Sequence, residues 1–149
     1  MKIEDEIKQP IFKNEYSKMV INIMFTSNWI NQKVHCFLKE FDLSPQQFNI
    51  LRILRGQYPG STTITTIQER MLDKMSNASR LVEKLRIKGF VTRDTDDSDR
   101  RQVKVKITEA GLELLKKTDS LNDKHNNFSD TITPEEAQTL NYLLDKLRD

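Results

Sequence analysis

The stretch from residue 74 to 108 constrains the fold of this chain more than any other part. Apolar residues recur at helical spacing in its first half and predict a helix with one buried face. These residues are Met75, Ala78, Leu81, Val82 and Leu85. Gly89 is expected to end the helix, because glycine adopts the left-handed backbone conformation without penalty. Val103, Val105 and Ile107 then alternate with polar residues, so a two-stranded hairpin is predicted after the helix.

The polar side of this helix carries the candidate recognition residues. They are Ser76, Asn77, Ser79, Arg80 and Lys84. In DNA grooves arginine can bridge guanine and asparagine can bridge adenine, while serine binds phosphate or either base. The alternative interpretation is a solvated polar face without a ligand. The adjoining hairpin loop, 94–101, ends in Asp99-Arg100-Arg101 and favours DNA recognition over that alternative.

The basic charge of the chain is concentrated on the same stretch. The whole sequence has a formal net charge of +2. Residues 70–106 hold eleven Lys and Arg against six Asp and Glu, whereas residues 107–149 hold five against nine. A local basic patch in an otherwise balanced protein is the expected electrostatic footprint of a polyanion-binding surface.

A single long helix is predicted from about Ile11 to Phe41, because apolar residues recur there every three or four positions. A helix of roughly 30 residues would extend about 45 Å. That length exceeds the need of a small domain, so part of the helix is expected to pack against another subunit. Phe25 and Trp29 lie off the main apolar stripe and either cover a second surface or fill a gap between helices.

Two further helices are predicted before the recognition stretch. Ser44-Pro45-Gln46-Gln47 has the N-cap serine, the proline at the first helical position and the glutamine at the third position of a capping box, and this helix should end near Arg55-Gly56. A short helix over about Thr65 to Leu72 follows, with Thr66 and Glu69 at capping-box spacing. With the next helix it forms a helix-turn-helix. Either Asp73 or Ser76 could supply the N-cap of that next helix.

The C-terminal part is predicted to be helical as well. Thr108 can cap a helix that runs to about Leu121, and the polar residues 123–130 are expected to fray or bend. Thr133-Pro134-Glu135-Glu136 repeats the cap, proline and glutamate signature of a helix start. Leucines in the last helix form a stripe that needs a partner.

Several classes of function lack support. The one cysteine, Cys36, cannot form an intrachain disulfide, and the N-terminus lacks the apolar core of a signal peptide. No apolar run reaches about 18 residues, so no membrane segment is expected and a cytoplasmic protein is predicted. His35 and His125 lie far apart, and there is no glycine-rich phosphate loop, so neither catalysis nor a cofactor is expected.

The acidic loop invites a metal-site interpretation, because four aspartates crowd between residues 94 and 99. A calcium loop that began at Asp94 would need glycine at its sixth position and glutamate at its twelfth. The chain has Asp99 and Val105 there. No metal site is therefore expected, and we interpret these carboxylates as groups that keep the loop soluble and reduce non-specific DNA affinity.

Two motifs resemble the multiple-antibiotic-resistance regulator (MarR) family of bacterial winged-helix transcription factors. The first runs over residues 79–85 into Lys88-Gly89-Phe90-Val91, and the second is Asp99-Arg100-Arg101 followed by a strand and Thr-Glu-Ala-Gly at 108–111. The order of elements also matches over nearly the whole chain. The implied fold is mainly α with a small β-wing, a winged helix-turn-helix with long N- and C-terminal dimerisation helices.

The resemblance implies a winged helix-turn-helix DNA-binding lobe at 44–108 and a helical dimerisation region at 11–41 and 109–149. It also implies a homodimeric repressor of a pseudo-palindromic operator, with half-sites roughly 34–36 Å apart. Family members are relieved by small phenolic or other ligands or by cysteine oxidation, so a small aromatic effector is a further expectation. The operator, the regulated genes, the sign of regulation and the effector are left open.

The resemblance also assigns roles in the wing. Arg101 matches the family arginine that enters the minor groove, and Asp99 would orient its guanidinium by a paired hydrogen bond. Arg100 and Lys104 would then reach phosphates.

The role of Cys36 does not carry over, because peroxide-sensing relatives have their reactive cysteine near the start of the first helix. A buried or interface thiol is therefore preferred to a redox switch. An effector pocket would lie where the first helix meets the DNA-binding lobe, with Trp29, His35 and Phe48 as candidate liners, and the effector residues themselves are left open.

The competing function is a winged-helix module that binds protein instead of DNA, since the fold alone does not dictate a nucleic-acid partner. The basic residues Arg80, Arg100 and Arg101 argue against it. An enzyme acting on a small molecule is the least supported class.

Overall fold

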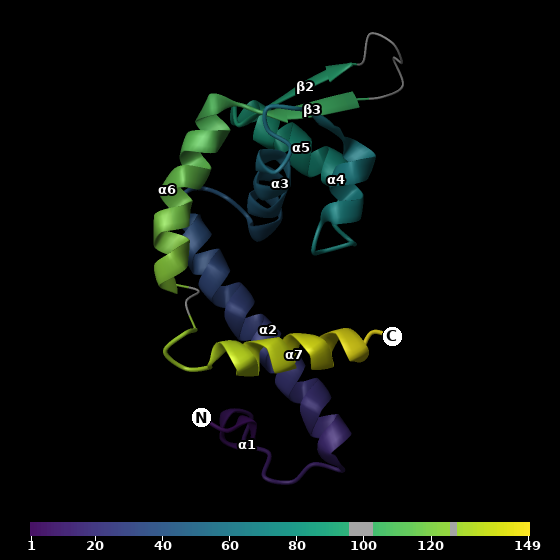
Figure 1. The fold of residues 1–149 in the computed structure, drawn as a ribbon, viewed down its shortest axis with the longest axis vertical. Helices are drawn as coiled ribbons and strands as arrows, with labels where there is room; N and C mark the ends of the chain where they lie inside the picture. The colour runs from purple at the N-terminus through teal and green to yellow at the C-terminus, as the bar shows by residue number, and fades with distance from the viewer. Residues whose placement is uncertain (96–102, 126–127) are drawn as a thin grey trace. The chain divides into compact units, whose positions relative to one another are not determined.

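The computed structural model describes residues 1–95, 103–125 and 128–149 (Figure 1). The chain divides into two compact units, Met1–Leu112 and Glu113–Asp149. The elements in chain order are α1 (Ile3–Glu6), α2 (Glu15–Lys39), α3 (Pro45–Arg55), β1 (Thr62–Thr63), α4 (Ile64–Arg70), α5 (Ala78–Ile87), β2 (Val91–Thr95), β3 (Val103–Ile107), α6 (Glu109–His125) and α7 (Pro134–Lys146). The predicted mainly helical fold with a small β-wing is confirmed.

The sheet of the first unit contains one strand more than the predicted hairpin. Its three described strands are antiparallel in the order β1-β3-β2. Thr62 pairs with Val105 on one side of β3, and Val91 pairs with Ile107 on the other. The hairpin prediction missed β1, because a strand of two residues is too short for apolar alternation to show.

The core of the first unit lies where α3, α4 and α5 meet the sheet. The fully buried side chains there come from all four parts of this lobe. They are Ile50, Leu51 and Leu54 of α3, Ile67 of α4, Val82 and Leu85 of α5, and Val105 of β3. The helical stripe of α5 and the alternation of β3 therefore face one core, as their periodicities predict.

The capping box at the start of α3 is confirmed. The backbone N–H of Gln47 donates to Ser44 Oγ, and the backbone N–H of Ser44 donates to Gln47 Oε1. The predicted cap of α4 was wrong. Thr63, not Thr66, accepts the capping hydrogen bond, from the backbone N–H of Thr66 at 3.1 Å. Thr63 also belongs to β1, so its pairing with β3 holds it in the extended backbone that an N-cap requires.

The long helix α2 is shorter than predicted. It begins after Asn14, whose side chain accepts a hydrogen bond from the backbone N–H of Ser17, and ends at Lys39. The short helix α1 precedes it and was not predicted. Of the residues of α2, Phe37 and Leu38 near its C-terminal end are buried.

The second unit contains most of α6 and all of α7. Helix α6 continues to His125 and so passes the predicted end at Leu121. The capping box of α7 is confirmed, because Thr133 and Glu136 exchange hydrogen bonds between side chain and backbone. None of the residues of α7 is buried within the described chain. Among the described residues, no helix is both long and apolar enough to span a membrane.

Candidate nucleic-acid interface

The turn between α4 and α5 is held by side chains from the helices around it. Gln68 of α4 donates from Nε2 to the carbonyl of Lys74 and accepts from the backbone N–H of Ala78, both at 3.1 Å. Asn49 of α3 accepts from the backbone N–H of Leu72 at 2.9 Å. The start of α5 is therefore fixed to the helices that precede it.

Asp73 organises the turn itself. Its carboxylate accepts from the backbone N–H of Met75 at 3.0 Å and from the Ser76 hydroxyl at 2.7 Å. The Ser76 and Met75 hydrogen bonds lower the pKa of Asp73 below its ordinary value of 3.8, because they stabilise the carboxylate. Asp73 therefore shapes the turn as an ionised group.

Helix α5 is capped by a residue that was assigned to base recognition. Asn77 Oδ1 accepts from the backbone N–H of Arg80 at 2.9 Å, so Asn77 is the N-cap, and the expectation that Asp73 or Ser76 fills this position was wrong. The inclusion of Met75 in the buried stripe was also wrong. Met75 lies in the turn before the helix and is 93% exposed.

Within α5 the predicted pattern holds, except that Leu81 of the apolar stripe is only half-buried. Ala78, Val82 and Leu85 are buried, while Ser79, Arg80 and Lys84 are exposed. Ser76 and Asn77 lie in the turn at the start of the helix, half-buried and exposed respectively. The five candidate recognition residues therefore occur on one helix and the turn that leads into it.

An ion-pair network joins α5 to the strand that leads into the wing. Glu83 lies 2.8 Å from Arg86 Nη2 and 3.6 Å from Arg93 Nη1, and Arg93 belongs to β2. Hydrogen bonding to Arg86, with a smaller contribution from Arg93, holds the pKa of Glu83 below its ordinary 4.5. The network ties helix and wing together at the surface. Sequence periodicity does not show the Glu83–Arg93 pair, because these two residues belong to different elements.

Three of the four predicted wing residues are not among the residues that the structure describes. Asp99, Arg100 and Arg101 lie outside the described residues. Lys104 is exposed on β3, where it stands opposite Asp94 of β2 in the antiparallel register. Its position on the outward side of the sheet agrees with the predicted alternation.

Two glycines shape the connections of the wing. Gly89 has φ +78° and follows the end of α5, as predicted. Thr108 donates from Oγ1 to the carbonyl of Gly89 at 2.8 Å and accepts from the backbone N–H of Gly111 at 3.2 Å. The predicted Thr108 cap of α6 is therefore confirmed, and it links α6 to the connection between α5 and β2.

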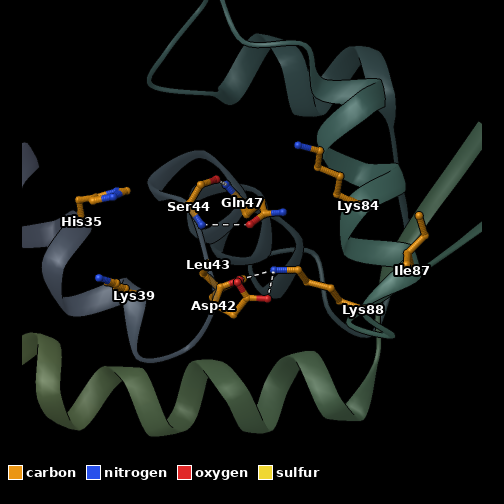
Figure 2. A pocket seen from close by; sticks show the side chains of 9 residues that line it. All are labelled: His35, Lys39, Asp42, Leu43, Ser44, Gln47, Lys84, Ile87 and Lys88. Atoms are coloured by element: carbon orange, nitrogen blue, oxygen red, sulfur yellow. Dashed lines mark hydrogen bonds and ion pairs between the residues drawn. The ribbon is translucent and has the colours of Figure 1, made fainter.

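An open pocket of about 530 Å³ lies between the C-terminal end of α2 and the outer side of α5 (Figure 2). Figure 2 shows His35 and Lys39 on the α2 side and Lys84, Ile87 and Lys88 on the α5 side. The floor between them is formed by residues 42–44 and Gln47. Three lysines against one aspartate make the pocket basic.

A second open pocket, of about 910 Å³, shares His35 and Ser44 with the first. Its lining includes Cys36, which is exposed, and Asp73 of the helix-turn-helix turn. The expectation was a buried or interface thiol; Cys36 is not buried within the single chain, and the interface position stays a prediction. Of the three suggested pocket liners, His35 lines both cavities, whereas Trp29 and Phe48 line neither of these two.

Within the described ranges, no cluster of three or more His, Cys, Asp or Glu residues could hold a metal ion. The acidic loop considered above lies mainly at 96–99, outside those ranges.

Residues 43–103 match the MarR family. Across the chain, the Escherichia coli multiple antibiotic resistance protein MarR is 28% identical over 124 residues, with 79% of this chain and 85% of that protein covered. A solved structure of an E. coli MarR mutant in complex with operator DNA has a TM-score of 0.75 at 24% identity, covering 92% of this chain and 98% of that one. Bordetella bronchiseptica BpsR, whose DNA binding is regulated by 6-hydroxynicotinic acid, has a TM-score of 0.75 at 20% identity, covering 94% and 98%. The two solved structures thus cover more than nine tenths of this chain, whereas the family match is confined to residues 43–103.

Proposed function

We propose that the chain, whose residues 43–103 match the MarR family, is a winged-helix transcriptional regulator of that family and represses transcription by binding a pseudo-palindromic operator as a homodimer. In this proposal it is a DNA-binding regulator and not an enzyme. The observation that carries the proposal is the exposed face of α5. Ser79, Arg80 and Lys84 project from a helix whose opposite side is buried in the core and whose start is held by Gln68.

We assign base reading to the N-terminal part of this helix. Helix-turn-helix proteins contact base edges with the first residues of the recognition helix. Arg80 is suited to guanine, and the Asn77 amide N–H groups stay available to a base while its oxygen caps the helix. Ser76, Ser79 and Lys84 then bind phosphate or either base.

The wing supplies the second contact in this proposal. Arg101 enters the minor groove with Asp99 orienting it, while Arg100 and Lys104 reach phosphates. The exposed position of Lys104 on β3 supports this assignment, because that strand leads directly out of the wing loop. Arg101→Ala is expected to weaken operator binding by about 1–3 kcal/mol, the range of one good groove contact.

Exposed apolar side chains on the terminal helices support the homodimer. Tyr16, Val20 and Met24 of α2 are 78%, 49% and 62% exposed. In the second unit, Leu140 and Leu143 of α7 are 51% and 53% exposed. Exposed apolar side chains on these helices are candidates for burial in an interface, so a second copy of the chain is the proposed cover.

The basic pocket beside α5 is the proposed effector site. Lys39, Lys84 and Lys88 suit a small anion, and the apolar side of Ile87 suits an aromatic ring, so an aromatic carboxylate fits the lining (Figure 2). Lys84 belongs both to the pocket and to the proposed DNA-binding face. A carboxylate bound there competes with phosphate for the same ammonium group, which would relieve repression.

The test is binding of the full-length protein to duplexes from its own promoter region at two salt concentrations. Affinity is expected to fall steeply with salt, because phosphate neutralisation releases counterions. Arg80→Ala should weaken binding by about 1–3 kcal/mol, and Lys84→Ala should also flatten the salt dependence. Lys13→Ala, ahead of α2, removes the same charge away from the lobe and should leave affinity unchanged. Absence of salt-sensitive binding to every fragment would contradict the proposal and favour a protein partner.

A further inference from the structure

Met75 combines a fixed backbone with a fully solvated side chain. Its backbone N–H is bound by Asp73, the neighbouring Lys74 carbonyl is bound by Gln68, and the following Ser76 hydroxyl is bound by Asp73. The side chain is nevertheless 93% exposed. Flexible surface loops commonly carry exposed apolar residues, but here hydrogen bonds from two sides hold the residue in one place.

The position of Met75 is equally specific. It lies two residues before the N-cap Asn77, at the end of α5 that helix-turn-helix proteins insert into the major groove. Lys74 precedes it, and the exposed Ser79 and Arg80 follow in the first turn of the helix. The cationic and polar groups around the methionine suit a polyanion, so the occupant that fits this surface is DNA.

Within the major groove, one base presents an apolar group. Thymine carries its C5-methyl there, and apolar side chains recognise thymine through that methyl. Methionine suits this contact, because its unbranched side chain with a polarizable sulfur adapts to irregular apolar surfaces. Resting on the DNA-binding function proposed above, we infer that Met75 reads the C5-methyl of one thymine in each half-site.

The neighbouring Leu72 offers a matched comparison. It is in the same turn and is 88% exposed, but it lines the larger pocket together with residues of α2. Leu72 therefore resembles Met75 in residue type, exposure and turn, but its surroundings differ. Any general effect of removing apolar surface from this turn should appear in both residues, whereas methyl reading should appear in Met75 alone.

The experiment is selection from a random-sequence duplex library at fixed salt by the full-length wild type, Met75→Ala, Met75→Leu and Leu72→Ala. The wild type is expected to enrich thymine at one position in each half-site. Met75→Ala should lose the preference at that position only, while Met75→Leu, which keeps an apolar side chain, should retain it. Leu72→Ala should select the same sequence as the wild type. Thermal unfolding and the oligomeric state should match the wild type in all three variants.

Replacing the selected thymine by uracil then removes only the methyl group. Wild-type affinity should fall about fourfold, which corresponds to ~0.8 kcal/mol for one buried hydrocarbon group. Met75→Ala should bind both duplexes equally. Equal binding of both duplexes by the wild type, or a fourfold loss that persists in Met75→Ala, would overturn the inference while leaving DNA binding intact. Failure of the wild type to select any duplex would instead refute the DNA-binding function on which the inference rests.

Discussion

Lys88 Nζ lies 2.8 Å from Asp42 Oδ2, and this ion pair connects the end of α5 to the segment between α2 and α3. The Lys88 ammonium also donates to the Asp42 carbonyl, and Asp42 has φ +52°. The pair closes one side of the basic pocket (Figure 2). It is therefore a direct contact between the end of α5 and the segment that precedes α3.

The Asp42–Lys88 pair is expected to contribute little to global stability. The Asp42 side chain is 94% exposed, so water and salt screen the attraction. A double-mutant cycle with Asp42→Asn and Lys88→Met should give a coupling free energy below about 1 kcal/mol in urea unfolding. Asparagine also tolerates the positive φ, so Asp42→Asn isolates the charge. A coupling that exceeds this range and survives 1 M salt would contradict the prediction.

Asn77 is expected to have two separable roles. Asn77→Ala removes the N-cap and should lower the free energy of unfolding by about 1 kcal/mol. Asn77→Ser retains a capping oxygen, so its stability should stay within a few tenths of a kcal/mol of the wild type. If the amide reads adenine, Asn77→Ser should still weaken operator binding by about 1–3 kcal/mol. Urea unfolding and fluorescence anisotropy on the same samples measure both quantities, and wild-type affinity in Asn77→Ser would restrict Asn77 to capping.

The Glu83 network should give stability a specific dependence on pH. Because Arg86 and Arg93 lower the folded-state pKa of Glu83, the stabilisation is fully present above the ordinary value of 4.5 and is lost as pH falls through the folded value. The urea midpoint of the wild type should therefore exceed that of Glu83→Gln above pH 5, and this gap should narrow as the pH is lowered towards 3. Arg86→Met should remove most of the same dependence. A gap that is constant over this pH range would show that Glu83 does not act through its charge.

Helix starts with a proline at the first position could be predicted from sequence, because all of their determinants lie within four residues. Ser44 and Thr133 both cap as predicted. The cap of α4 could not be predicted in this way. Thr66 and Glu69 satisfy the local spacing, but the backbone of Thr63 is held extended by pairing with Lys104 in β3. That pairing joins residues 41 positions apart, so a local pattern does not contain it.

Met75 shows the corresponding limit for the candidate site. Its spacing from Ala78 and Val82 matches a helical stripe, yet the bonds from Asp73 and Gln68 hold a turn until Asn77 caps the helix. Periodicity identifies which residues could share a face, but it does not show where the helix begins. The exposure of Ser79, Arg80 and Lys84 was predicted correctly because these residues lie inside the helix, where the period applies.

Gly111 should be the glycine least tolerant of substitution. A Cβ there would lie 2.5 Å from the carbonyl oxygen of Phe90 and 2.7 Å from Ile107 Cγ1. The Phe90 oxygen cannot easily move, because it accepts from the backbone N–H of Thr108 at 3.0 Å. Alanine gains about 1 kcal/mol of helix propensity over glycine, but the clash should outweigh it. Gly111→Ala is expected to lower the free energy of unfolding by about 1–3 kcal/mol, as overpacking does.

Gly89 provides the matched control, because its constraint is conformational and not steric. Nothing lies within 4 Å of a Cβ built there, but its φ of +78° is left-handed. Gly89→Ala should cost about 1–2 kcal/mol, and Gly89→Asn should cost less, because asparagine adopts this conformation more readily. At Gly111 the order should reverse, since the larger asparagine meets the same backbone oxygen. Urea unfolding of the four variants measures the pattern. If alanine and asparagine destabilise the protein in the same order at both sites, it is not the case that sterics constrain Gly111 and backbone conformation constrains Gly89.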